Sequence, residues 1–238
     1  MKKILILGSK PEALVPADVD YVYASNASAY FYKDKISPFP KLVIVASAGV
    51  IYGADLSEQP KFYKITNSVR DELIVSGIDK IPGAQEKISE EVSCKQIRYY
   101  SAQARREIFY SIVGGNLVIP MLLACMHGKV EALWFLKYLW HLARAKFNNT
   151  DVPGAYRPST GLFALAYAIG EHSKHSVYIV SGIGFERRGK YPDGSNVRHR
   201  KNPHHLIPDM LCFSELRKRY KILTTDPFVS KQFSIPLL

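Results

Sequence analysis

The chain has 238 residues, of which 47% are hydrophobic, and its formal net charge is +11 at pH 7. This length and apolar content suit one α/β domain with a full core and exclude a disordered chain, while no apolar run reaches the roughly 18 residues that a membrane span needs. The positive charge is typical of proteins that bind a nucleic acid, an anionic membrane surface or a phosphorylated ligand, and by itself does not choose among the three.

The cysteines and the start of the chain bear on the cellular compartment. Cys94, Cys125 and Cys212 are scattered and odd in number, which argues against a disulfide framework and for a reducing compartment. In MKKILIL the lysines precede only a short apolar run without a small-residue cleavage site, so a buried strand is favoured over a signal peptide. We expect a cytoplasmic protein, with the inner face of the membrane as an alternative location.

The first fifty residues alternate short apolar runs with turns. Residues 4–7, 21–24 and 42–45 are rich in β-branched or aromatic side chains and predict three strands. Residues 26–32, between the second and third of these runs, predict a short helix. Strands separated by such connections are typical of parallel βαβ units.

The middle of the chain is predicted to be mainly helical in its second half. Residues 53–100 mix charges, prolines and glycines and give no readable order of elements. Residues 116–147 predict a helical segment that is broken near Gly128, and residues 148–158 predict a loop.

The last eighty residues return to an α/β pattern. Residues 160–171 predict a buried helix that leads into a strand at 177–180. Residues 186–203 are polar, glycine-containing and strongly basic, which predicts a lid loop. Residues 208–220 predict another helix, followed by a last strand at 221–224.

Gly8-Ser9-Lys10-Pro11 is a turn directly after the first predicted strand. Ligands of parallel α/β sheets bind outside the carboxyl ends of the strands, so this turn is a candidate nucleotide contact. It lacks the GxGxxG pattern, and the chain has no GxxxxGK[ST], so neither a dinucleotide site nor a P-loop is indicated. Taken alone, a purely structural turn is the favoured interpretation.

Arg157-Pro158-Ser159-Thr160-Gly161 opens the helix predicted at 160–171. Hydroxyl groups and backbone N–H groups at a helix start bind anions, and an arginine adds a bidentate donor for phosphate. An ordinary N-cap also explains Ser or Thr at this position and is favoured when the segment is taken alone.

His204 and His205 precede the predicted helix that contains Asp209. A histidine titrates near neutral pH and can take a proton from an alcohol, and a carboxylate close to it in the fold would orient its ring. A histidine pair in a basic loop is one alternative. A metal pair is another, but ligands on one helical turn are three or four residues apart, so adjacent histidines make a poor clamp.

Asp18-Val19-Asp20 matches in letters the DxD motif of metal-dependent glycosyltransferases. The motif precedes a predicted strand instead of following one, which is the wrong edge of the sheet for a ligand. We therefore interpret it as a turn and expect no metal site.

Taken together and in this order, these elements resemble the bacterial sialyltransferases of glycosyltransferase family 42. RPSTGLFALAYAIG followed by VYIVSGIGF is similar to the family's R-x-[ST]-[ST]-G helix and its strand ending in SGIDF, and also to the small sialylmotif of animal sialyltransferases. The Gly8 turn is similar to the family's GNGPS turn, and Ser25-Asn26 is similar to its asparagine after the next strand. His204, Asp209 and the YKI of residues 220–222 match the family spacing without a gap.

The resemblance implies a role for each matched position. His204 would be the catalytic base on the acceptor hydroxyl, Asp209 would lie near it in the fold and orient its ring, and Tyr191 would hold the leaving phosphate. The CMP site would be lined by Gly8, Ser9, Asn26, Arg157, Ser159, Thr160 and Gly161.

The chain departs from the family pattern at three places. A second phosphate-binding tyrosine of the family is Glu186 here, which cannot donate a hydrogen bond when ionised. Ser9 stands for the turn asparagine, and Ala46-Ser47 stands for the asparagine after the third strand. Three nearby cations would be electrostatic substitutes for the missing tyrosine: Arg187, Arg188 and Lys190.

The resemblance predicts one GT-A-like, sialyltransferase-type Rossmann-like domain over residues 1–238, with a parallel central sheet and the basic lid loop. It implies a metal-independent inverting transfer of sialic acid from CMP-sialic acid to a glycan hydroxyl, without a cofactor. A CMP-Kdo or other nonulosonate transferase is one alternative, and a non-catalytic nucleotide- or nucleic-acid-binding protein is another. No RNA-binding signature is visible, so we do not expect a nucleic acid as partner.

The helical residues 130–147 raise a separate question about partners. Trp134, Tyr138 and Trp140 lie among cations, as in helices that bind at a membrane interface. Core packing or an oligomer interface is the favoured interpretation, and peripheral membrane association is the alternative.

Overall fold

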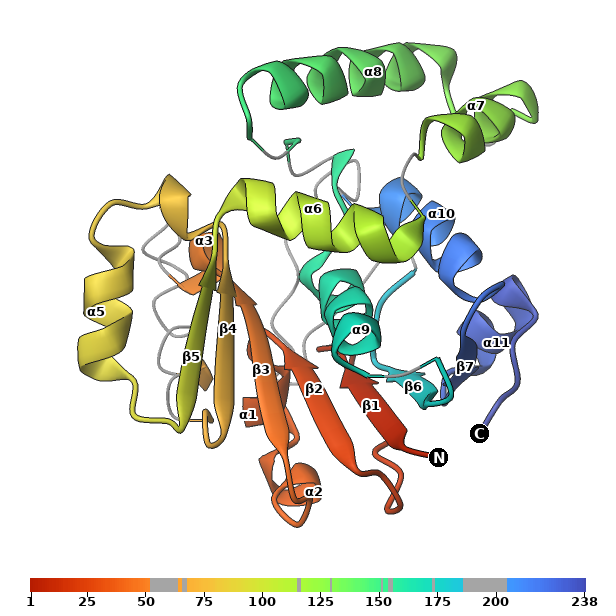
Figure 1. The fold of residues 1–238 in the computed structure, drawn as a ribbon. Helices are drawn as coiled ribbons and strands as arrows, with labels where there is room; N and C mark the ends of the chain where they lie inside the picture. Colours follow the sequence, from red (N-terminus) through yellow and green to blue (C-terminus); the bar gives the residue numbers. More distant parts are fainter. Residues whose placement is uncertain are drawn as a thin grey trace.

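A computed structural model describes residues 1–51, 64–65, 68–114, 117–128, 130–150, 152–153, 156–172, 174–185 and 205–238. Over these residues the chain forms one seven-stranded sheet with helices on both faces (Figure 1). All paired strands are parallel, in the order β5-β4-β3-β2-β1-β6-β7. The predicted α/β class with a parallel central sheet is therefore confirmed.

The strands are β1 (Lys3–Leu7), β2 (Tyr21–Ser25), β3 (Leu42–Ser47), β4 (Glu72–Ser76), β5 (Gln96–Tyr100), β6 (Val177–Ser181) and β7 (Lys221–Thr224). The helices before the middle of the chain are α1 (Ser28–Phe31), α2 (Lys33–Ile36), α3 (Ala48–Ile51), the 3₁₀ turn η2 (Ile78–Lys80), α5 (Ala84–Glu91) and α6 (Ala102–Val113). The later helices are α7 (Val118–Met126), α8 (Ala132–Phe147), α9 (Thr160–Glu171), α10 (Leu206–Leu216) and α11 (Pro227–Phe233).

Five strands lie where the sequence predicts them, and β4 and β5 are additional. The predicted strands are short apolar runs because a parallel sheet is covered on both faces. In contrast, β4 (ELIVS) opens with the buried Glu72 and has only a short apolar run after it, and β5 (QIRYY) is a half-buried edge strand.

Alternate residues of each strand enter two separate hydrophobic cores. Ile4 and Ile6 of β1 pack on the face covered by α6, α9 and α10, whereas Leu5 and Leu7 pack on the face covered by α1, α2 and α3. In Figure 1, α6 and α9 lie in front of the sheet and the short helices α1 to α3 lie behind it. The carboxyl ends of the strands lie toward the upper side of this view, where β5 leads into α6.

The predicted helix at 160–171 coincides with α9, and the predicted helix at 208–220 corresponds to the shorter α10. Residues 161–169 of α9 are all buried, because this helix packs directly on β1, β2 and β3. Pro208 lies in the first turn of α10, where its missing N–H group costs no helical hydrogen bond.

The helical segment predicted at 116–147 forms two helices, α7 and α8, interrupted at Gly128, which has φ +68°. Phe135, Tyr138 and Leu142 of α8 are buried in the front core, as the core-packing interpretation predicts for one face of the helix. In Figure 1, α7 and α8 form the outermost layer, above α6. Among the described helices none meets the length and apolarity of a membrane span alone, although α6 and α7 meet them together as a bent pair.

Candidate functional site

The strand order reverses at the carboxyl ends of β1 and β6. From β1 the strands proceed outward through β2 to β5, and the chain then returns to place β6 on the other side of β1. In open parallel sheets a ligand crevice lies at such a reversal. The predicted Gly8 turn is located there.

Gly8 and Gly182 pack backbone against backbone at this reversal. The Gly8 N–H group donates to the Ser181 carbonyl at 2.8 Å, and the Lys10 N–H group donates to the Gly182 carbonyl at 2.9 Å. A Cβ atom on Gly8 would lie 2.1 Å from the Gly182 oxygen, and Gly182 itself has φ +68°. Both positions therefore require glycine, and the turn after β1 is held against the loop after β6.

The start of α9 lies against the same loop. The Cβ position of Gly161 is 3.3 Å from the Ile183 side chain. Two of the four N–H groups that open the helix have partners within the protein: that of Ser159 donates to Asp209 Oδ1 at 2.7 Å, and that of Leu162 donates to Ser159 Oγ at 3.4 Å. The other two, of Thr160 and Gly161, have no acceptor within α9 by helix geometry and are groups of the kind that bind anions at a helix start.

Asp209 of α10 lies beneath the start of α9 and is 2% exposed. Burial raises the pKa of its carboxyl to about 7, against the opposing effect of hydrogen bonds from Ser159 and the charge of Arg105. Near neutral pH this group therefore exchanges between its ionised and neutral forms.

Replacing Asp209 with asparagine should change how stability depends on pH. Asparagine keeps an oxygen acceptor for the Ser159 N–H group but cannot ionise. Because the folded pKa of Asp209 is raised above its ordinary value of 3.8, the folded chain holds this proton between about pH 4 and pH 7 while the unfolded chain releases it. As the pH rises through that window, the free energy of unfolding of the wild type should fall relative to that of Asp209→Asn by roughly 1.4 kcal/mol for each pH unit.

Urea unfolding of both proteins at pH 4.5, 6 and 8 measures this difference. Glu215→Gln, which removes a half-exposed carboxyl from the same helix, provides the control. If the difference in the free energy of unfolding between wild type and Asp209→Asn stays constant over the three pH values, the pKa of Asp209 is not raised in the folded protein.

His205 joins the start of α10 to the segment before α9. Its Nδ1 atom lies 2.8 Å from the Arg157 carbonyl oxygen, and the Asp209 N–H group donates to the His205 carbonyl at 2.8 Å. Since a carbonyl oxygen only accepts, Nδ1 carries the proton and Nε2 is the unprotonated nitrogen of the neutral ring. The structure thus brings two predicted motifs, around Arg157 and around Asp209, into direct contact.

Asn26 is at the same edge of the sheet, at the end of β2. It adopts φ 50°, which asparagine tolerates, and its Oδ1 atom accepts a hydrogen bond from the Ser47 N–H group at 3.4 Å. The hydroxyl groups of Ser25 and Ser28 donate to the Leu7 carbonyl at 3.2 and 2.9 Å. These bonds tie the ends of β1, β2 and β3 together, beside the half-buried Ser9.

Several predicted site residues lie outside the described residues. These include His204, Tyr191 and the lid loop at 186–203, with Glu186 and its neighbouring cations. The predicted base, the leaving-phosphate tyrosine and the pairing of Asp209 with His204 therefore stay predictions. The hydrogen bond of the Asp209 carboxyl that the structure describes is with Ser159.

Asp18 and Asp20 lie at the opposite edge of the sheet. Asp20 Oδ2 accepts a hydrogen bond from the Lys3 N–H group at 2.8 Å, and Asp18 forms an ion pair with the Lys3 side chain. These contacts join the turn before β2 to the start of β1, in agreement with the interpretation of the DxD letters as a turn.

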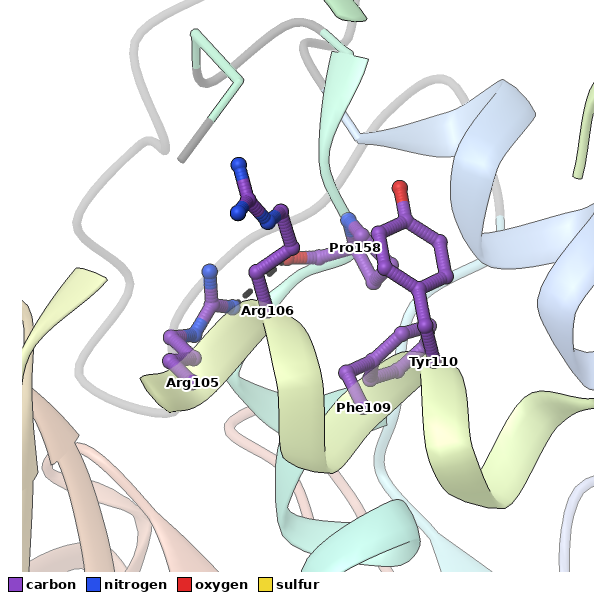
Figure 2. A pocket seen from close by; sticks show the side chains of 5 residues that line it. All are labelled: Arg105, Arg106, Phe109, Tyr110 and Pro158. Carbon is purple, nitrogen blue, oxygen red and sulfur yellow. Dashed lines mark hydrogen bonds between the residues drawn. The ribbon is translucent and has the colours of Figure 1, made fainter. Parts of the chain in front are cut away.

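Arg105 of α6 is a site residue that the sequence analysis missed. It is 6% exposed, donates to the Pro158 carbonyl at 2.9 Å, and places its guanidinium 5.0 Å from the Phe163 ring centroid. Figure 2 shows this contact beside a pocket lined by Arg105, Arg106, Phe109, Tyr110 and Pro158. The spacing of Arg105, Phe109 and Val113 at i, i+4 and i+8 was a usable signal that Arg105 shares the buried face of α6, but it does not reveal the contact with Pro158.

Comparison of the chain with protein-family models, curated proteins and solved structures finds no match in any of the three. The family resemblance and the residue roles that it implies therefore rest on the sequence motifs.

Proposed function

We propose that this protein is a sialyltransferase-like glycosyltransferase that transfers sialic acid from CMP-sialic acid to a glycan hydroxyl. The observation that carries the proposal is the meeting of three distant motifs at the β1–β6 reversal. The Gly8 turn contacts Gly182, the side chain of the next residue Ile183 lies 3.3 Å from the Cβ position of Gly161, and Ser159 of the α9 start contacts Asp209. This is the arrangement that a shared nucleotide site would need.

The phosphate of CMP would be held by the start of α9. The N–H groups of Thr160 and Gly161 supply donors at the positive end of the helix, and Arg157 precedes them on the same segment. CMP leaves with a single phosphate, so hydrogen-bond donors can stabilise the developing charge without the metal ion that a diphosphate leaving group usually needs.

The transfer itself would be an inverting displacement. His204 removes the proton from the acceptor hydroxyl as the oxygen attacks the anomeric carbon, which develops oxocarbenium character. The bond to the CMP phosphate breaks, and Tyr191 donates a hydrogen bond to the departing oxygen. A CMP-Kdo or other nonulosonate donor would use the same nucleotide contacts, and only the sugar pocket would differ.

CMP should stabilise the protein far more than UDP, because a ligand that binds the native state raises its melting temperature.

Arg157→Ala should weaken CMP binding by about 1.5 to 3 kcal/mol, the range for a hydrogen bond to a charged group. Thermal shift with CMP, UMP, UDP and a single-stranded oligonucleotide, followed by calorimetric titration of CMP, measures both effects.

The matched control is Arg70→Ala. Arg70 donates to the Phe39 carbonyl at 2.7 Å beside the amino ends of the strands, so its removal takes one cation from the opposite edge of the sheet. CMP affinity should be unchanged in this variant. Equal stabilisation by UDP, or none by CMP, would refute the donor assignment, and a shift with the oligonucleotide alone would favour the nucleic-acid alternative.

A further inference from the structure

Helices α7 and α8 expose an unusual amount of apolar surface. Eight of the fourteen large hydrophobic side chains that are exposed in the described part of the chain belong to these two helices. Their exposed fractions run from 43% to 92%. They are Ile119, Leu122, Leu123 and Met126 of α7, and Leu133, Leu136, Trp140 and Phe147 of α8. We call this set the α7–α8 apolar surface.

The spacing of these residues places them on one face of each helix. The four positions on α7 follow i, i+3, i+4 and i+7, and those on α8 follow i, i+3, i+7 and i+14. The buried residues Phe135, Tyr138 and Leu142 occupy the opposite side of α8 and enter the core. Each helix therefore has one face in the protein and one apolar face in solvent.

The α7–α8 apolar surface has more exposed hydrophobic residues, at more regular spacing, than scattered surface residues would have. Single exposed hydrophobic residues are normal on a protein surface, but grouped ones mark a site of interaction with another molecule. Figure 1 places both helices on the outside of the fold, beyond α6 and on the side where the strands end.

The charges around this surface indicate the kind of partner. α8 has three exposed cations, Lys137, Arg144 and Lys146. Lys137 follows Leu133 by four residues and Arg144 follows Trp140 by four residues, so these two border the apolar stripe of α8. The sequence of α8 contains no acidic residue, and that of α7 contains no charged residue. Within α7 and α8 all the charged side chains are therefore cations, and the exposed Glu131 lies at the N-cap of α8. An apolar stripe bordered by these cations is complementary to an anionic lipid surface.

The same charges disfavour a second copy of the chain as the occupant. A two-fold contact brings the same patch of both subunits together, so Lys137 and Arg144 would face equivalent cations without a carboxylate of α7 or α8 to pair with them. An aromatic residue such as Trp140, which is 68% exposed, is also well suited to the boundary between lipid headgroups and acyl chains. We propose that the α7–α8 apolar surface binds the anionic surface of a phospholipid membrane, with α8 lying in the plane of the interface.

Binding to defined vesicles tests this proposal without reference to catalysis. Wild-type protein should sediment with vesicles of phosphatidylcholine and phosphatidylglycerol and stay in the supernatant with phosphatidylcholine alone. The chain has two tryptophans, so Trp134→Phe leaves Trp140 as the single reporter, and its emission should shift to the blue only with the anionic vesicles.

Two variant pairs separate the proposed surface from net charge. Lys137→Glu with Arg144→Glu should lower the vesicle partition coefficient by at least about 30-fold, which corresponds to two cations at roughly 1 kcal/mol each. Lys33→Glu with Lys35→Glu changes the net charge equally but lies on α2 at the amino edge of the sheet, and it should bind far better than the first pair. Leu136→Gln with Trp140→Gln should also abolish sedimentation while circular dichroism stays that of the wild type.

Three results would overturn the proposal. The first is wild-type protein that stays wholly in the supernatant with anionic vesicles. The second is an equal loss of vesicle binding in the two charge-reversal pairs, which would mean that binding depends on the net charge of the protein and not on this surface. The third is a dimer in analytical ultracentrifugation that Leu136→Gln with Trp140→Gln dissociates, together with no vesicle binding, which would assign the surface to a second copy of the chain.

Discussion

Replacing His204 with alanine is expected to lower turnover by roughly 10²- to 10⁴-fold, the usual contribution of a positioned general base. The affinity for CMP should change little, because the base contacts the acceptor hydroxyl and not the donor. Steady-state rates with CMP-sialic acid, together with calorimetric titration of CMP, measure the two quantities separately. The acidic limb of the wild-type rate profile should report one group that titrates in the histidine range.

His205→Ala is the matched control, and the structure sharpens what it should do. The ring bond to the Arg157 carbonyl would be lost, so we expect a stability loss of about 1 kcal/mol and a turnover close to that of the wild type. Because this bond leaves Nε2 unprotonated, His205 is the alternative base. If His205→Ala abolishes turnover and His204→Ala does not, the base is His205, and if neither matters, the proposed mechanism does not apply.

Gly8→Ala is expected to lower the free energy of unfolding by about 3 kcal/mol or more and to weaken CMP binding. The new Cβ atom would lie 2.1 Å from the Gly182 carbonyl oxygen, and neither partner is a side chain that can rotate away. The loops after β1 and β6 would have to separate, with the cost of an overpacked interior. Urea unfolding and CMP titration measure the two effects.

Gly184→Ala provides the control within the same loop. A Cβ atom at Gly184 would meet no atom of the described residues within 4 Å, so this variant should keep wild-type stability and wild-type CMP affinity. If Gly8→Ala proves as stable as Gly184→Ala, the close packing of the two loops does not hold β1 and β6 together. If Gly8→Ala is destabilised but binds CMP normally, the nucleotide does not use this turn.

The sequence alone was sufficient for the elements whose local pattern has one physical explanation. KILIL and VYIVS read as buried strands because a strand covered on both faces needs apolar residues on both sides. Ser159 and the apolar run after it indicated the start and the burial of α9, since a hydroxyl caps a helix and small residues allow close packing on a sheet. The rule that ligands bind where parallel strands end predicted the Gly8 turn as a candidate contact, whereas Asn26 was assigned to the same site by the family resemblance.

Other features depended on contacts between residues far apart in the chain. The helix pattern around Arg105 does not reveal that its guanidinium reaches the Pro158 carbonyl, 53 residues away, and the sequence near Asp209 does not reveal Ser159 as its partner. Trp140 and Tyr138 look alike in an apolar helix, yet one is 68% exposed and the other is fully buried. Hydrophobic periodicity identifies the faces of a helix, but only the tertiary structure decides which apolar face meets the core and which meets solvent, because burial requires a partner surface that the helix itself does not carry.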